Sequence, residues 1–301
     1  MNVIVTGSGG LIGSEAAKFF LKKGKVRGID NNMRSVFFGP QGDVSNVISD
    51  LSRDKNYSHA RGTIVLLEAF RKYATKDAVF IHMSTNKVYG DGPNHLNLAE
   101  SYNRYDFSDP EYKNGISETF PIDRCLHSLF GASKVSGDIV AQEYGKYFGL
   151  NVGIFRGGCL TGPQHAGVEL HGFLSYIIKC ALSGKKYTVF GYKGKQVRDQ
   201  IHSIDVIKAF ENFIENPKKG EVYNIGGGFK NSASVLEIIN ILKNRYDLHL
   251  DNRISEENRV GDHICYYTDL SKLKSHFPNW NISRSLDRII DEMIFNNMDK
   301  N

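Results

Sequence analysis

The pattern that most restricts the fold of this chain lies in residues 1–30. Residues 2–6 form an apolar run typical of a buried strand, and residues 11–23 repeat apolar side chains at helical spacing. Gly7, Gly10 and Gly13 lie in the turn between strand and helix, and a second strand is predicted over 25–30, ending at Asp30. A strand, a crossover helix and a second strand make a βαβ unit, which requires parallel strands.

The same alternation continues along the chain. Helices are predicted over 62–73 and 131–148, and strands over 78–83, 152–155 and 221–225. Strands that alternate with helices in this way indicate an α/β fold with a Rossmann-like, doubly wound parallel sheet.

One interval is too short for this fold. Between Asp30 and Ala78 we predict only a short helix, around 44–51, and the helix over 62–73. Two further strands, one helix and their loops would need about 35–50 residues, and the sequence does not contain them. Either a segment is missing near residues 56–62, or the sheet is truncated. We favour a missing segment, because removal of central strands would leave backbone groups unpaired.

The glycine turn predicts a phosphate-binding site. Glycine lets the backbone turn tightly and approach a pyrophosphate, with amide N–H groups at the positive end of the next helix. We therefore predict that a dinucleotide is bound by Gly7, Gly10, Leu11, Ile12 and Gly13.

The acidic residue after the second strand indicates which dinucleotide is bound. Asp30 is placed to accept hydrogen bonds from an adenosine ribose, and its charge would repel a 2′-phosphate. NAD is therefore the predicted cofactor, although Arg34 nearby leaves NADP open.

Composition excludes several other classes of protein. The 38 Lys and Arg against 33 Asp and Glu leave a charge of +5, too diffuse for a nucleic-acid surface but suited to an anionic small substrate. The four cysteines, too far apart for a metal site, are predicted to be free thiols in a reducing compartment. No apolar run is long enough for a membrane helix, and the N-terminus lacks signal-peptide features. We expect a cytoplasmic protein that binds no metal.

The stretch Ser84-Thr85-Asn86-Lys87-Val88-Tyr89-Gly90 follows a buried strand. It resembles the active-site strand of the extended short-chain dehydrogenase/reductases that act on nucleotide sugars, the NAD-dependent epimerase/dehydratase family. The resemblance implies that Thr85 hydrogen-bonds the reacting sugar oxygen, that Asn86 contacts the substrate, and that Ser84, with Asn31 and Asn32, contacts NAD.

The family also carries a Tyr-x-x-x-Lys pair on the following helix, in which the lysine lowers the pKa of the phenol. Here the matching residues are Phe130 and Lys134. Lys134 is predicted to hold the nicotinamide ribose, whereas phenylalanine cannot transfer a proton. Tyr89, His127 or a water on Lys134 remain as candidate bases.

The C-terminal half resembles the family's substrate lobe. The resemblance implies that residues 1–160 form the NAD-binding domain and 161–301 a smaller nucleotide-sugar-binding lobe, with about 196–228 packing back on the first. Arg198 in Lys195-Gln196-Val197-Arg198-Asp199 and Arg259 in Asn258-Arg259-Val260-Gly261-Asp262 would bind the diphosphate, and Asp262 a ribose hydroxyl.

These motifs together with Glu169-Leu170-His171-Gly172-Phe173 look most like proteins grouped with the CDP-paratose (CDP-tyvelose) 2-epimerases. That likeness implies epimerisation of a CDP-hexose in polysaccharide biosynthesis, by oxidation to a keto-sugar and return of the hydride, in a homodimer. A dehydratase or reductase on a related sugar is a second possibility. Because of Phe130, a protein that binds NAD and a sugar nucleotide without turnover is a third.

Overall fold

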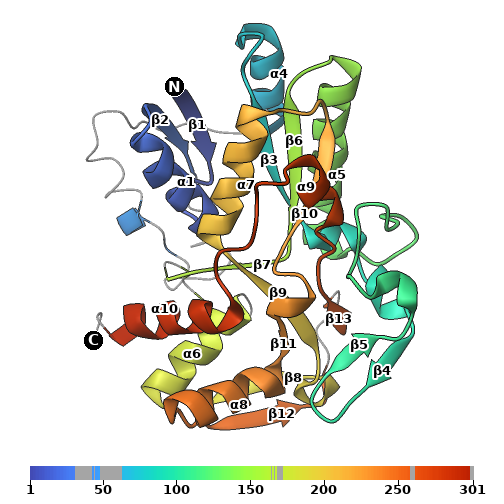
Figure 1. Cartoon of the computed structure of the whole chain (residues 1–301), viewed down its shortest axis with the longest axis vertical. Helices are drawn as coiled ribbons and strands as arrows, with labels where there is room; N and C mark the ends of the chain where they lie inside the picture. The colour runs from blue at the N-terminus through green and yellow to red at the C-terminus, as the bar shows by residue number, and fades with distance from the viewer. Residues whose placement is uncertain are drawn as a thin grey trace.

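The structure, a computed structural model, describes residues 1–30, 43, 45–47, 63–163, 165, 167, 172–257 and 262–298. It has the predicted α/β architecture, in which helices connect and cover parallel strands (Figure 1). No helix in these ranges is long and apolar enough to cross a membrane.

The N-terminal βαβ unit forms as predicted, from β1 (Asn2–Thr6), α1 (Leu11–Leu21) and β2 (Lys25–Ile29). β1 and β2 pair in parallel, with Asn2 opposite Lys25. The helix ends earlier than predicted because the chain turns sharply at Gly24. A Cβ atom at Gly24 would lie only 2.0 Å from the carbonyl oxygen of Met1.

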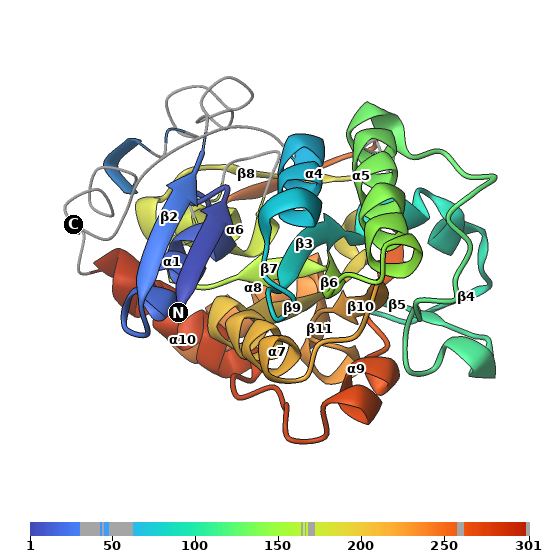
Figure 2. The same ribbon diagram turned by 90° about the horizontal axis from the view of Figure 1, so that it is seen from above.

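A second parallel sheet has the order β10–β6–β3. It consists of β3 (Phe80–Thr85), β6 (Val152–Gly157) and β10 (Glu221–Ile225). β3 and β6 extend beyond their predicted ends because the full lengths of the two strands pair, residue by residue, as far as Thr85 and Gly157. Helices α4 (Thr63–Tyr73) and α5 (Ser128–Tyr147) lie side by side against this sheet (Figure 2).

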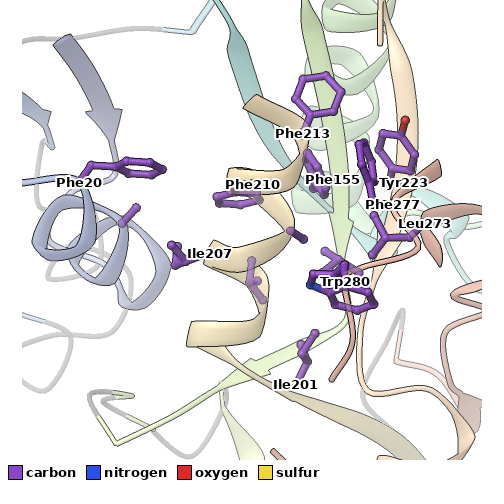
Figure 3. Close-up of a cluster of buried hydrophobic side chains, with 14 of the residues drawn as sticks. Phe20, Phe155, Ile201, Ile207, Phe210, Phe213, Tyr223, Leu273, Phe277 and Trp280 are labelled. Carbon is purple, nitrogen blue, oxygen red and sulfur yellow. The ribbon is translucent and has the colours of Figure 1, made fainter. Parts of the chain in front are cut away.

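Helix α7 (Ser203–Glu215) joins the two sheets. Its residue Phe210 belongs to the same buried cluster as Phe20 of α1 and Phe155 of β6 (Figure 3). Trp280, the only tryptophan, closes this cluster and donates its indole N–H to the carbonyl oxygen of Asp205 at 2.8 Å. Among the described residues, apolar packing on α7 therefore connects the two sheets.

The C-terminal part has its own apolar cluster, formed mainly by α6 (Phe173–Ser183), α8 (Val235–Tyr246) and α10 (Leu286–Met298). Ser234 and Glu237 form a capping box at the start of α8, which satisfies the first N–H groups of the helix. The other elements are β4 (Leu98–Glu100), β5 (Tyr105–Phe107), β7 (Cys159–Thr161), β8 (Tyr187–Phe190), β9 (Val197–His202), β11 (Ser232–Ser234), β12 (Asn252–Ser255), β13 (Cys265–Tyr266) and α9 (Ser271–His276).

The short interval before α4 lies largely outside the described residues. Residues 45–47, within the predicted helix 44–51, are helical. The proposed break near residues 56–62 lies outside the described ranges, as do Asn31, Asn32, Arg34 and Arg259. No strand of the described residues lies between β1 and β3.

Candidate functional site

A cavity of about 1750 Å³ runs along β1 and β3, from Met1 to Gly7 and from Ala78 to Lys87, and so reaches the carboxyl ends of both strands. It brings together the predicted cofactor-binding and substrate-binding residues that the structure describes, with Phe130 and Lys134. They come from the glycine turn and the start of α1, the residue after β2, β3 and the residue after it, α5, β9 and the loop before β13: Gly7, Gly10, Leu11, Ile12, Gly13, Asp30, Ser84, Thr85, Asn86, Phe130, Lys134, Arg198 and Asp262.

The glycine turn has the geometry that a bound pyrophosphate requires. Gly7 has φ of +65°, a left-handed conformation that glycine adopts without strain. At Gly13 a Cβ atom would lie 1.9 Å from the carbonyl oxygen of Gly7, so only glycine lets α1 approach the strand so closely. Asp30 lies beside the turn, where its Oδ2 accepts the backbone N–H of Gly9 at 2.7 Å. Turn and carboxylate thus fit the pyrophosphate and adenosine ribose of NAD.

Thr85 and Asn86 lie where β3 passes into a short 3-10 helix, Asn86–Tyr89. The Thr85 hydroxyl accepts the backbone N–H of Lys87 at 3.3 Å and donates to Asn86 Oδ1 at 3.4 Å. Both contacts are long, so the hydroxyl is positioned but only weakly engaged.

Phe130 and Lys134 lie on one face of α5, as their spacing predicts. The Lys134 ammonium is 5.8 Å from the centre of the Phe130 ring, and both side chains line the cavity. Phe130 is 57% exposed, so its ring is not a core residue. Burial lowers the pKa of Lys134.

Arg198 and Asp262 form an ion pair with an N–O distance of 2.7 Å. Lys87, to which the sequence assigned no role, also donates to Asp262 Oδ1, at 3.1 Å. Burial opposes ionisation of Asp262, but the charges of Arg198 and Lys87 hold its pKa well below the usual range. The cavity therefore contains two cations beside one carboxylate, a surplus of positive charge that suits a diphosphate.

A buried polar network beneath Thr85 was not predicted. The Asp138 carboxylate, fully buried on α5, accepts hydrogen bonds from Arg156 Nε at 3.0 Å and from Ser84 Oγ at 2.5 Å. Arg156 also donates to the Tyr89 hydroxyl at 3.1 Å, and Tyr89 donates to Asn224 Oδ1 at 2.7 Å. The network ties α5 to β3, β6 and β10 directly below the cavity.

This network bears on the candidate bases. Burial raises the pKa of Tyr89 to about 12, and its hydroxyl is already engaged in the network. His127 uses Nε2 to contact the carbonyl oxygen of Val88 at 2.9 Å. Neither side chain is among the described residues that line the cavity, whereas Lys134 is. Of the three candidate positions, Lys134 is therefore the one that faces the cavity.

In the part of the chain that the structure describes, no group of three or more His, Cys, Asp or Glu residues could hold a metal ion. Cys125, Cys159, Cys180 and Cys265 are free thiols. Burial raises the pKa of Cys159, which lines the cavity, to about 11, so this thiol is protonated at neutral pH.

Comparison with known proteins gives a consistent result. The sequence model of the NAD dependent epimerase/dehydratase family matches residues 41–226. CDP-paratose 2-epimerase of Salmonella typhi is 33% identical over 220 residues, which cover 70% of this chain and 62% of the relative. A dTDP-glucose 4,6-dehydratase of Escherichia coli is 30% identical over 217 residues, 69% of this chain and 54% of the relative. The chain thus spans less than two thirds of the length of either relative.

Solved structures resemble the whole chain. UDP-glucuronic acid 4-epimerase from Bacillus cereus, in complex with UDP-glucuronic acid and NAD, has a TM-score of 0.77 at 23% identity and covers 100% of both chains. dTDP-glucose 4,6-dehydratase from Bacillus anthracis, in complex with NAD, has a TM-score of 0.73 at 22% identity and covers 99% of this chain and 97% of its own. These likenesses confirm the predicted Rossmann-like fold.

Proposed function

Because the chain belongs to the NAD dependent epimerase/dehydratase family, we propose that it epimerises a nucleotide-activated hexose, with a CDP-hexose as the substrate. The observation that carries this proposal is that one cavity gathers the glycine turn, Thr85, Lys134 and the Arg198–Asp262 pair. The 33% identical CDP-paratose 2-epimerase supports a CDP-hexose over other nucleotide sugars.

NAD is the cofactor of this family, and when bound it would supply the acceptor and donor of a hydride. The chain's own residues have separate tasks. The glycine turn and Asp30 would hold the adenosine diphosphate, and Lys134 the nicotinamide ribose. Ser84 would contact NAD, and Asn86 would contact the sugar substrate. Thr85 would orient the sugar oxygen whose proton must move, and a water on Lys134 would relay that proton to the neutral lysine amine, whose pKa is lowered by burial.

This function is tested by incubating a CDP-hexose with the purified protein and NAD, and monitoring conversion of the sugar by proton NMR. Epimerisation inverts one ring carbon, which changes the coupling constants of the proton on that carbon and leaves the mass of the sugar nucleotide unchanged. A dehydratase would instead remove one water, and a reductase would consume NADH. If NAD and the CDP-hexose both bind but the sugar is not converted, the protein is a non-catalytic binding protein. The phenylalanine at position 130, which cannot transfer a proton, favours this alternative.

Asp30 is expected to determine the choice of cofactor. Asp30→Ala should weaken NAD binding by about 1.5–3 kcal/mol, the range for a charge-assisted hydrogen bond, and NADP binding far less. Titration calorimetry with both cofactors measures the difference. Since Asp30 also holds Gly9 N–H, damage to the turn alone would weaken NAD and NADP equally, and that outcome would contradict the assignment.

Arg198 is expected to bind the substrate diphosphate. Arg198→Ala should lower the affinity for a CDP-hexose at least tenfold, about 1.4 kcal/mol, while NAD affinity stays constant. Asp262 keeps Lys87 as a partner in this variant, so no isolated carboxylate complicates the result. Arg253→Ala, on exposed β12, is the matched control. Unchanged affinity for the sugar nucleotide would contradict the assignment of Arg198 as a diphosphate ligand. It would also count against the same role for Arg259.

A homodimer is part of the proposal. Apolar side chains on adjacent α4 and α5 are exposed, among them Val65 at 69% and Ile139 at 43%. A second copy that packs the same two helices against these would cover them, and sedimentation equilibrium measures the stoichiometry. The free cysteines suit the proposed cytoplasmic role in polysaccharide biosynthesis.

A further inference from the structure

Strand β9 presents a row of polar side chains to the cavity. Gln196, just before the strand, and Arg198 and Gln200 within it follow each other at every second position, and all three line the cavity. Successive side chains of a strand point to opposite faces, so these three residues share one face. The other face lies in the protein interior, where Ile201 belongs to the buried cluster around α7. One face of β9 is therefore part of the ligand cavity.

Gln200 is the fully buried glutamine of this row, with 1% of its surface exposed. Among the residues that the structure describes, its amide nitrogen Nε2 has no hydrogen-bond partner. Arg198, by contrast, is paired with Asp262. Gln196 donates its amide N–H to the carbonyl oxygen of Phe190 at 3.2 Å, although its own Oε1 also has no partner there. Buried polar groups are nearly always hydrogen-bonded, because an unmade bond costs the full desolvation of the group. The Gln200 amide therefore requires a partner that the described residues do not supply.

Strand pairing places Gln200 on the cavity wall between Arg198 and Thr85. Gln200 lies opposite Cys159 of β7. Cys159 follows two residues after Gly157, which lies opposite Thr85 of β3. Neighbouring strands are about 4.8 Å apart, and residues two apart along one strand about 6.6 Å. A molecule that is bound at Arg198 and extends along the wall to Thr85 therefore passes Gln200.

The charge of the cavity wall changes along this path. Arg198 and Lys87 place two cations beside the Asp262 carboxylate, which suits a diphosphate. Beside Gln200 the wall is neutral, because the amide carries no charge and burial raises the pKa of the Cys159 thiol to about 11. An amide N–H donates to the oxygen of a hydroxyl group. The wall therefore matches a molecule in which an uncharged, hydroxyl-bearing group follows a diphosphate, as the hexose does in a nucleotide sugar.

We propose that Gln200 donates a hydrogen bond from its amide to one hydroxyl oxygen of the hexose, and so determines which hexoses are bound. This inference rests on the proposed function, because it takes a nucleotide-activated hexose as the ligand. With Arg198 on the diphosphate and Thr85 on the reacting oxygen, Gln200 would hold the substrate at a third point. A site that bonds a ligand hydroxyl rejects the analogue that lacks it, because the buried amide is then left unpaired.

The test measures affinities by titration calorimetry with NADH present, which cannot accept a hydride from the sugar, so that no conversion accompanies binding. The probes are CDP-glucose, UDP-glucose and dTDP-glucose and, for the one that binds most tightly, a set of analogues that each lack one hydroxyl of the glucose. We expect one of these analogues to bind the wild type about tenfold more weakly than its parent, or worse. With Gln200→Leu the same analogue and its parent should bind equally, since neither finds a donor at this position. The other analogues should lose the same affinity in both proteins.

Gln196→Leu is the matched control, because it removes the other glutamine of the row, on the side of Arg198 away from Thr85. It should leave every ratio of analogue to parent affinity unchanged. Urea unfolding of the ligand-free variants tests for a structural role. Because the Gln200 amide has no partner among the described residues, neither Gln200→Leu nor the unbranched Gln200→Met should lower the free energy of unfolding. A lower value for both variants would mean that the amide is bonded inside the protein, and would overturn the proposal.

Two further results would overturn it. One is an equal set of losses for all analogues in the wild type and in Gln200→Leu, and the other is failure of all three sugar nucleotides to bind. Failure of the proposed function gives different results. The expected pattern with UDP-glucose or dTDP-glucose would support the role of Gln200 and contradict a CDP-hexose as the substrate. The expected pattern without conversion of the sugar by NMR would support the role of Gln200 and contradict epimerisation.

Discussion

Phe130→Tyr is expected to raise the rate of CDP-hexose epimerisation by about 10²–10⁴-fold, the usual contribution of a positioned acid–base group. The Phe130 ring lies 5.8 Å from the Lys134 ammonium and lines the same cavity as Thr85. A hydroxyl added to this ring would lie in the field of a cation, which lowers the pKa of a phenol. The substitution adds one oxygen to an otherwise complete arrangement, and initial rates by NMR measure its effect.

The control for this prediction removes the cation. In Phe130→Tyr combined with Lys134→Met the gain should disappear, whereas Phe130→Leu alone should leave the wild-type rate nearly unchanged. An equal rate for wild type and Phe130→Tyr would mean that the native enzyme uses another base. If both proteins bind NAD and the CDP-hexose but neither converts the sugar, the non-catalytic alternative is correct.

Asp138→Asn is expected to lower the free energy of unfolding by about 3–5 kcal/mol, the cost of leaving a buried charge without its partner. Arg156 is 4% exposed and Asp138 fully buried, so no water replaces the lost interaction. Urea unfolding followed by circular dichroism measures the change. Asp287→Ala, which removes an exposed partner of Arg245, should have little effect and serves as the control.

A second variant separates charge from packing. Asp138→Asn combined with Arg156→Met removes both charges and should recover much of the loss, since apolar replacement of a whole buried pair is often neutral. Although burial raises it, the pKa of Asp138 is lowered overall by Arg156. Its stabilisation is therefore present above the unfolded-state pKa and disappears as the pH falls through the folded one. A loss below 1 kcal/mol for the single variant would contradict this account.

Local patterns were sufficient to predict much of the fold. The βαβ unit, α5 and β6 follow from periodicity and glycine spacing within short windows. The ends of β3 and β6 were predicted less well, because strand length is set by the partner and not by the strand itself. Among the described strands β1 and β3 belong to separate sheets, and the sequence indicated this only as a shortage of residues before α4.

The candidate site was predictable where a motif is continuous in sequence. The glycine turn, the Thr85 turn and the Phe130–Lys134 pair are each local, and all line the cavity. Lys87 was missed because its partner Asp262 is 175 residues away. Asp138 lies one turn after Lys134 on α5, which could have marked it as a residue near the site. Only the fold pairs it with Arg156 and Ser84.

The position of Trp280 gives this protein an internal optical probe. Since it is the only indole in the chain and is 2% exposed, its native emission arises from one apolar environment, the cluster around α7 that joins the two sheets. A red shift of that emission would show that water has reached the apolar cluster that joins the two sheets. Coincidence of the shift with loss of helical ellipticity would mean that both sheets unfold in one cooperative step. An earlier shift would mean that the sheets separate while each is still folded.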